Sequence, residues 1–378
     1  MGIFLEFKKS FLRPSIIIIT FILILLNVLV FVEEYAYATR RSIQTRDEYM
    51  YFYPIVEGKI EREKVNELLN LEKENLQKYN QGIVSYEDEE GNLLYTHANR
   101  ITLETMIEDL QYTYFYPLKI DGIINKAKLN IEDPNLVNYT NEKKKNQKII
   151  DAYSNRYIKK FGLTRGYELL FNYKISSFFL LLVLVLPLST LFAEEKESNR
   201  YQILVGQETK SRCIKHKLIA AYIFIFILSI SFYIIDILCF NHIWAMNALF
   251  NPIYSLKLYQ NTFLNVNIFA FIVINFLFMF VAYCFMGLIF IITSLNTKKV
   301  STSLGINYIV LIFIIGLTDF VKISFNPFNL LVNKDMFKMF SAKKILFYTV
   351  YEPWYYLVLS LFCIVLLMGV LRRSAKKW

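Results

Sequence analysis

The sequence predicts an all-α polytopic membrane protein, and three observations lead to that fold class. Hydrophobic residues make up 55 % of the 378 residues, and aromatic residues make up 17 %. Glycine and proline are scarce, with 12 and 8 copies. Several apolar runs reach the roughly 18 residues that cross a hydrocarbon core about 30 Å thick. Most of these runs lack the polar stripe of a helix that covers a soluble core, so we expect them to lie in lipid.

Six apolar runs define six expected transmembrane helices. They cover residues 14–32, 175–193, 218–240, 266–295, 303–321 and 354–371. The polar block 33–174 is expected to form a mixed, mainly helical extracellular domain inserted between the first two spans. The region 218–371 holds spans three to six, with an amphipathic extracellular helical segment near 325–352. Residues 372–378 form a basic cytoplasmic tail.

The distribution of Lys and Arg predicts the orientation in the membrane. The chain carries a net charge of +10, yet the block 33–174 is slightly more acidic than basic. Basic residues instead gather at the N-terminus, in 194–217, after the fourth span and in the tail. Six spans place all of these on one side, so we expect a multi-pass cell-membrane protein with both termini cytoplasmic. The opposing lysines, which would lie outside, are Lys322, Lys334, Lys338, Lys343 and Lys344.

Residues 1–13 are expected to form an amphipathic helix in the inner interface before Pro14 turns the chain into the bilayer. Its apolar face would hold Ile3, Phe4, Phe7 and Phe11. A frayed basic terminus is the alternative. The first apolar run is too long for the core of a usual signal peptide, so we interpret it as an uncleaved anchor, although Ala36 and Ala38 resemble a cleavage site.

The extracellular block contains three helix candidates and one acidic turn. The helices are expected over 59–79, from about Thr102 to 115, and over 146–161, and the turn over 87–95. Gly82 is a plausible stop for the first helix. The many tyrosines of this block could form a ligand-binding face or pack near the lipid headgroups, and the sequence leaves both open.

The motifs of several enzyme classes are absent. No nucleotide-binding loop of the form G-x-x-x-x-G-K-[ST] occurs. The string EEKESNR resembles the EExxxR motif of membrane proteases, but its arginine is one residue late and no H-E-x-x-H motif occurs. The four cysteines lack metal-ligand spacing, and we interpret them as apolar fillers. We therefore expect no catalytic residue and no cofactor in this chain.

Polar residues within or near the spans are candidates for function. Asp236, Asp319 and Lys322 lie toward expected outer span ends, where interfacial solvation is the alternative to a functional role. Asp319 and Lys322 are three residues apart and could pair along one helix face. Asn275 is expected, together with Asn267 and Asn307, to form hydrogen bonds between helices.

The connection 194–217 is far longer than a simple turn requires. It mixes charged residues with a compact apolar group, Tyr201, Ile203 and Leu204, before a break at Gly206. This composition favours a protein-docking element, and a merely solvated loop is the alternative.

This region resembles the type-2 ABC transporter permeases. The resemblance rests on Phe192-x-x-Glu195, the aliphatic pair Ile203-Leu204, and Ser211-Arg212 followed by lysine. Asn199 stands where glycine is common in that family, which is a departure. Motif-level resemblance covers only 192–217, whereas the six spans and the large outer insertion resemble the family in architecture alone.

The resemblance implies a permease subunit of an ATP-driven exporter. A cytosolic ABC ATPase, which would hold the ATP and magnesium, would grip a coupling helix in 194–217. The implied coupling residues are Phe192, Glu195, Arg200, Tyr201, Ile203, Leu204, Ser211 and Arg212. A second permease copy or a sister permease would complete the transporter in contact with membrane lipids, and nucleic acid is not an expected partner. The substrate would be an amphiphilic peptide, lipid or drug, with antimicrobial peptide export or immunity as one case. The alternative is a membrane sensor whose outer block binds a ligand without transport.

Overall fold

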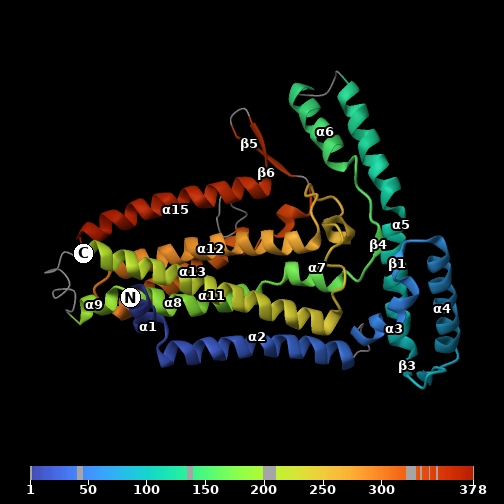
Figure 1. Ribbon diagram of the computed structural model, residues 1–378, viewed down its shortest axis with the longest axis horizontal. Helices are drawn as coiled ribbons and strands as arrows, with labels where there is room; N and C mark the ends of the chain where they lie inside the picture. The colour runs from blue at the N-terminus through green and yellow to red at the C-terminus, as the bar shows by residue number, and fades with distance from the viewer. Residues whose placement is uncertain are drawn as a thin grey trace.

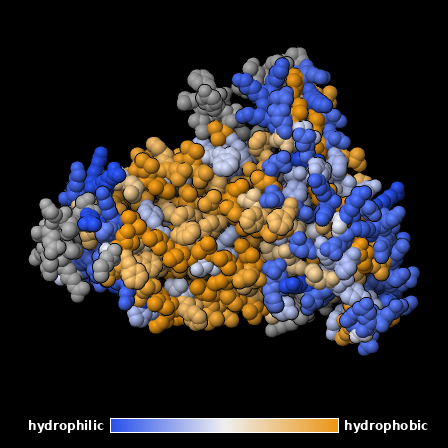
Figure 2. Space-filling model, viewed as in Figure 1, coloured by the Kyte–Doolittle hydropathy of each residue, from blue (hydrophilic) through white to orange (hydrophobic). Residues whose placement is uncertain are grey.

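The computed structural model is a long helical bundle that carries a second group of helices at one end (Figure 1). The structure describes residues 2–40, 46–133, 139–198, 210–320, 329–332, 334–339, 341–345 and 348–377. A broad apolar belt surrounds the bundle, and hydrophilic residues gather at both of its ends (Figure 2). This distribution matches a protein embedded in a bilayer.

Within the described residues, five helices are long and apolar enough to cross a membrane. They are α2 (Pro14–Arg40), α8 (Ile175–Thr190, which α7 and α9 extend at its ends), α11 (Lys210–Trp244), α12 (Ile268–Asn296) and α15 (Glu352–Lys377). A sixth helix, α13 (Val300–Phe320), packs on α8, but its described apolar stretch, Val300–Ile314, is shorter. The mostly helical class with several candidate membrane-spanning helices is confirmed, and the count of six remains a prediction.

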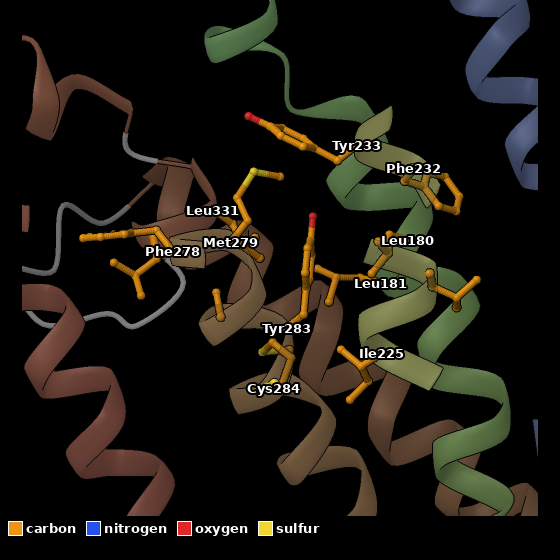
Figure 3. Close-up of a cluster of buried hydrophobic side chains, with 14 of the residues drawn as sticks. Leu180, Leu181, Ile225, Phe232, Tyr233, Phe278, Met279, Tyr283, Cys284 and Leu331 are labelled. Atoms are coloured by element: carbon orange, nitrogen blue, oxygen red, sulfur yellow. The ribbon is translucent and has the colours of Figure 1, made fainter. Parts of the chain in front are cut away.

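Helix α8 lies at the centre of the bundle. Its most apolar window is 67 % buried, whereas the windows of α2 and α15 are only 17 % buried and those helices lie at the periphery. Side chains of α8, α11 and α12 meet in the core, where Leu181, Ile225 and Tyr283 converge (Figure 3). Gly287 permits this approach, because a Cβ there would lie 2.7 Å from Ile225 Cδ1. Small residues at helix crossings are typical of membrane bundles.

Both ends of the chain lie at the same end of the bundle, together with α1 (Gly2–Phe11) and α9 (Ala193–Glu197) (Figure 1). The predicted N-terminal helix is confirmed. Phe11 is buried and Phe7 packs beside it, but Phe4 is 67 % exposed and does not share their contact. The basic residues of α1, α9, the start of α11 and the end of α15 therefore lie together.

The opposite end of the bundle carries a second group of helices, which we call the outer domain from its place at that end (Figure 1). Its helices are α3 (Arg46–Val56), α4 (Arg62–Asn80), α5 (Thr96–Glu132) and α6 (Tyr139–Tyr153). Helix α7 (Arg165–Asn172) leads from this domain into α8 and packs in the bundle core. Short antiparallel pairs join β1 (Gly58–Lys59) to β4 (Lys160–Phe161) and β2 (Ser85–Glu87) to β3 (Leu93–Tyr95). The inserted segment is thus mainly helical with small strand pairs.

Several expected elements of this domain are present with changed bounds. Helix α4 matches its prediction, and Gly82 follows it with a φ of 76°. The acidic turn is the β2–β3 connection, where Gly91 has a φ of 83°. Helix α5 starts six residues before Thr102 and continues through Pro117, and α6 ends at Tyr153 rather than 161.

The prediction of a helical segment near 325–352 is wrong for the second half of that range. Short helical turns occur at α14 (Asn329–Val332) and η3 (Lys334–Phe337), but β5 (Ala342–Ile345) and β6 (Tyr348–Tyr351) then form an antiparallel hairpin. The sequence Tyr-Thr-Val-Tyr of β6 consists of β-branched and aromatic residues, which favour a strand. The loop from α11 to α12 contains two short turns, η1 (Ile253–Ser255) and η2 (Lys257–Tyr259).

Candidate functional site

The end of α8 is held by side chains from neighbouring helices. The last carbonyls of a helix lack partners within it. Ser303 of α13 donates a hydrogen bond to the Ser189 carbonyl at 2.7 Å. Ser294 of α12 accepts hydrogen bonds from the amides of Phe192 and Ala193 at 3.0 and 3.1 Å. The chain leaving α8 is therefore fixed to α12 and α13 before it enters α9.

Glu195 of α9 lies between two lysines. Its carboxylate is 2.9 Å from Lys9 Nζ and 2.6 Å from Lys217 Nζ. Glu195 is 4 % exposed and Lys217 is 1 % exposed. Lys217 also donates a hydrogen bond to the Leu191 carbonyl at 3.0 Å. A buried charge is tolerated when it is paired and hydrogen-bonded, and both conditions are met here.

A second, more exposed pair lies beside the first. Arg13, between α1 and α2, is 2.7 Å from the Glu194 carboxylate. Burial lowers the pKa of Lys9, but its hydrogen bond with Glu195 and the charge of that carboxylate outweigh this, so the pKa is raised overall. Lys9 therefore stays charged. We call Lys9, Arg13, Glu194, Glu195 and Lys217 the ion network; it joins α1 and the start of α2 to α9 and α11.

Helix α1 also packs directly on α11. The rings of Phe11 and Phe224 stack with centroids 4.5 Å apart. A Cβ at Gly2 would lie 2.5 Å from His216 Nδ1, so the two helices approach closely there. The ion network is thus backed by apolar contact, and α1 is anchored to the first turns of the third candidate span.

The predicted coupling residues divide into three groups. Phe192 is fully buried, with Lys217 Nζ 5.0 Å from its ring centre, and Glu195 is buried in the ion network. Arg212 is exposed on the first turn of α11, and Ser211 lies in the same turn, although the structure does not describe its side chain. Four residues lie outside the described residues, namely Arg200, Tyr201, Ile203 and Leu204. Phe192 and Glu195 therefore hold the base of the connection rather than a surface.

Sequence reasoning missed Lys9 and Lys217 as members of this site. Lys9 was read as a charge that sets the topology, and Lys217 as such a charge and as one of two candidates, with Lys215, for the lysine of the permease motif. The available signal is that Lys217 lies at the very boundary of an apolar run and Lys9 lies one helical turn before Arg13. Neither feature identifies Glu195 as the shared partner of the two lysines. Lys9 lies 186 positions before Glu195 in the sequence.

Asp236 is buried, which argues against interfacial solvation, the alternative that its position in the sequence left open. It is 3 % exposed, and Asn27 of α2 donates a hydrogen bond to its carboxylate at 2.8 Å. The Tyr173 hydroxyl donates to the Asn27 side-chain carbonyl at 2.9 Å. This chain of contacts links α2, α11 and the residue that follows α7.

The three asparagines have different roles. Asn275 of α12 donates to the Tyr233 hydroxyl of α11 at 3.2 Å, and Asn307 of α13 donates to the Ser189 hydroxyl of α8 at 2.7 Å. Both expected interhelical bonds are confirmed. Asn267 instead caps α12 by accepting from the Ala270 amide, which corrects that prediction. The proposed Asp319–Lys322 pair falls outside the described side chains.

A second polar site joins the outer domain to the loop before α12. Arg156 is 5 % exposed, and its guanidinium donates to the carbonyls of Thr262 and Leu264 at 2.8 and 3.4 Å. It lies 4.0 Å from the Tyr153 ring centre and 4.9 Å from that of Tyr254. Arg156 lies three residues after the end of α6, so these contacts fasten the end of that helix to the loop.

Tyrosines of α5 and α6 reinforce this junction. Tyr116 stacks on Tyr254 with centroids 5.3 Å apart. The hydroxyls of Tyr112 and Tyr153 each donate to a loop carbonyl at 2.7 Å. Burial raises the pKa of Tyr112, so its hydroxyl keeps its proton and remains a donor. These tyrosines pack and bond within the protein at this junction. The two readings of the sequence, a ligand-binding face or packing near the lipid headgroups, both stay predictions.

Lys257 forms the charged part of the same junction. Its ammonium is 2.9 Å from Asp109 and 3.1 Å from Glu108, both on α5. Burial raises the pKa of Asp109, while the positive charge of Lys257 opposes that rise. The outer domain is therefore attached to the loop that leads into α12 by this ion pair as well as by Arg156.

The described residues contain no group of three or more His, Cys, Asp or Glu side chains that could hold a metal ion. The four cysteines are free thiols, and Cys284 is buried among apolar side chains. In comparisons with known proteins, no family model matches the chain, and no curated protein or solved structure is significantly similar to it.

Proposed function

We propose that this chain is the permease subunit of an ATP-driven exporter that moves an amphiphilic peptide, lipid or drug. ATP and magnesium would bind a separate cytosolic ABC ATPase rather than this chain. The end that carries the ion network faces the cytoplasm, as its many basic residues favour, and the outer domain lies outside.

The observation that carries the proposal is the position of Glu195 between Lys9 and Lys217. A segment that receives force must be joined stiffly to the helices that it moves. Because the ion network joins α9 to α1 and α11, a push on the connection after α9 reaches several helices at once. A passive turn between two spans would need no buried ion network of this kind.

The path of the chain supports a sixth span. Lys196 of α9 contacts the Leu295 carbonyl, so α12 ends near the ion network. Helix α15 begins at the outer-domain end and finishes where α12 ends (Figure 1). The chain must therefore recross the bundle between 297 and 351. The 21 residues of α13 are about 32 Å long as a helix, which is sufficient for that crossing.

The exposed faces of α2 and α15 support a paired assembly in lipid. Phe21 of α2 is 66 % exposed, and Val365 of α15 is 67 % exposed. Such faces are stable only against lipid or against another membrane helix. A second copy or a sister permease would use part of this surface.

The deciding experiment isolates the tagged chain from its native membrane and identifies any ATPase that accompanies it. A double variant that combines Ile203→Asp with Leu204→Asp changes the segment expected to dock. It should abolish both copurification with the ATPase and ATP-driven export. Val84→Asp is the matched control, because Val84 is 75 % exposed on the outer domain. Retained copurification and export in the double variant would exclude docking at 203–204.

The fixed outer junction gives the sensor alternative a specific basis. Arg156 ties the outer domain to the loop before α12, so a ligand on that domain could act on the bundle without crossing it. Reconstituted vesicles distinguish the two functions. Export predicts ATP-dependent movement of substrate across the vesicle membrane, whereas a sensor predicts ligand-dependent ATPase activity with no movement.

A further inference from the structure

A cleft of about 380 Å³ opens where α2, α7 and α11 meet below the outer domain. The end of α11 contacts both α2 and α7 there, on the side of the bundle that carries the outer domain (Figure 1). We call this space the outer cleft. Its place at the boundary between apolar and polar surface is the depth at which lipid headgroups lie.

Close packing fixes the position of α7 over the outer cleft. A Cβ at Gly166 would lie 2.6 Å from Met246 Cγ, so only glycine permits this approach. The Tyr167 hydroxyl donates to the Met246 carbonyl at 3.0 Å. Because both of these contacts with Met246 fix α7 in place, the cleft is already present when no ligand is bound.

The inner wall of the outer cleft is aromatic. Phe31 meets Phe240 edge-on with centroids 4.9 Å apart, and it lies 4.8 Å from the Tyr173 ring. Phe31 and Phe240 are buried and form the base of this wall, whereas Tyr173 and Trp244, which also line the cleft, are only partly buried. Aromatic faces of this kind attract a cation and pack against methylene groups.

Two opposite charges line the same cleft. Glu34 comes from α2 and Arg165 from α7, and both side chains are exposed. Within the described part of the chain, neither has a hydrogen bond or ion pair. A carboxylate and a guanidinium beside an aromatic wall are complementary to a headgroup that carries both an ammonium and an anion.

We propose that the outer cleft binds the headgroup of a zwitterionic phospholipid. Its ammonium would lie by Glu34 and the aromatic wall, its phosphate by Arg165, and its acyl chains along the lipid-facing side of α2. This site goes beyond the proposed function, because binding requires neither an ATPase nor transport.

The test uses the full-length chain in detergent and the fluorescence of Trp244. Brominated phosphatidylethanolamine should quench this fluorescence at a lower mole fraction than brominated phosphatidylglycerol. The Trp244→Phe variant should lack the quenched part of the fluorescence, which would assign that part to Trp244. Glu34→Gln and Arg165→Gln should each raise the midpoint for phosphatidylethanolamine about fivefold, the upper end for a partly exposed ion pair.

The matched controls are Glu63→Gln and Arg62→Gln, two exposed charges on α4 that should leave the midpoint unchanged. Equal quenching midpoints for the two lipids would overturn the proposal, and so would equal midpoints for the cleft variants and the parent. Either result would mean that the cleft contacts bulk lipid without binding a particular headgroup. If the Arg165→Gln variant fails to fold, the quenching midpoint of the Glu34→Gln variant alone tests the proposal. Loss of ATPase copurification would bear only on the proposed function, so the two ideas fail independently.

Discussion

Glu195 and Lys217 form a buried ion pair with 2.6 Å between carboxylate oxygen and ammonium nitrogen. One residue lies just after α8, and the other lies in the second turn of α11. Both side chains are almost fully withdrawn from solvent. The pair therefore fixes the two ends of the connection between these helices, whatever the connection itself contacts.

Glu195→Ala should destabilise the protein strongly. The substitution leaves the Lys217 ammonium buried without a carboxylate, with the Leu191 carbonyl and the Phe192 ring as its remaining contacts. Loss of one member of a buried pair costs about 3–5 kcal/mol. We expect a large fall in the melting temperature of the detergent-solubilised protein, together with loss of export.

A double variant separates stability from coupling. Glu195→Leu with Lys217→Met removes both charges and replaces them with apolar groups of similar size, a change that is often nearly neutral. Thermal stability should return close to that of the parent. If export also returns, the ion pair serves only the fold; if export stays lost, the pair transmits force. A double variant as unstable as Glu195→Ala would contradict the pairing.

The bundle was largely predictable from the sequence because lipid imposes a simple rule. A run such as 266–295 has to be a helix, since its backbone finds no water to bond. Helices α2, α8, α11, α12 and α15 follow from that rule alone. The hairpin formed by β5 and β6 does not follow from that rule. A short amphipathic stretch is compatible with either a helix or a strand, and pairing with a second strand determines which of the two forms.

The candidate site was predictable only in part. The break after Phe192 is visible as a change from apolar to charged residues. The partners of Glu195 are not visible in the sequence. Lys9 comes from a distant part of the chain, and Lys217, at the other end of the same connection, looks like an ordinary boundary charge. The burial of Asp236 was not predictable either, because only the fold places Asn27 next to it.

Arg156→Lys should loosen the outer junction. A lysine keeps the charge but cannot give the forked donors that bond Thr262 and Leu264, and it stacks less well on Tyr153 and Tyr254. Buried carbonyls left without donors cost about 1–3 kcal/mol. We expect faster amide hydrogen exchange in the loop 251–267, with exchange in α8 unchanged. Unchanged exchange in the loop would show that the tyrosines hold the junction alone.

The β2–β3 turn should resist acid. Asp88 accepts hydrogen bonds from the side chain and amide of Asn92, the Glu90 amide and the Tyr51 hydroxyl, and these lower its pKa to about 2 from 3.8. Because the folded-state pKa is depressed, the stabilisation is complete above pH 3.8 and is lost as the pH falls through about 2.

Hydrogen exchange of the 85–95 segment, corrected for intrinsic rates, measures this effect. Protection should persist at about pH 3 and disappear near the depressed pKa. Asp88→Asn should abolish much of the protection even at neutral pH, while Asp121→Asn, an exposed position on α5, is the control. Loss of protection already at the ordinary carboxyl pKa would contradict the hydrogen-bonded carboxylate.

Gly287→Leu should separate α12 from α11 and α8. Even a Cβ at this position would lie 2.7 Å from Ile225 Cδ1 and 3.4 Å from Leu188 Cδ1, so a leucine has no room. Overpacking of this kind typically costs about 1–3 kcal/mol. Gly369→Leu on α15 is the matched control, since a Cβ there meets no atom within 4 Å. Thermal unfolding in detergent should show a lower midpoint for the first variant and no decrease for the second. Equal midpoints would mean that α12 does not cross α11 at Gly287.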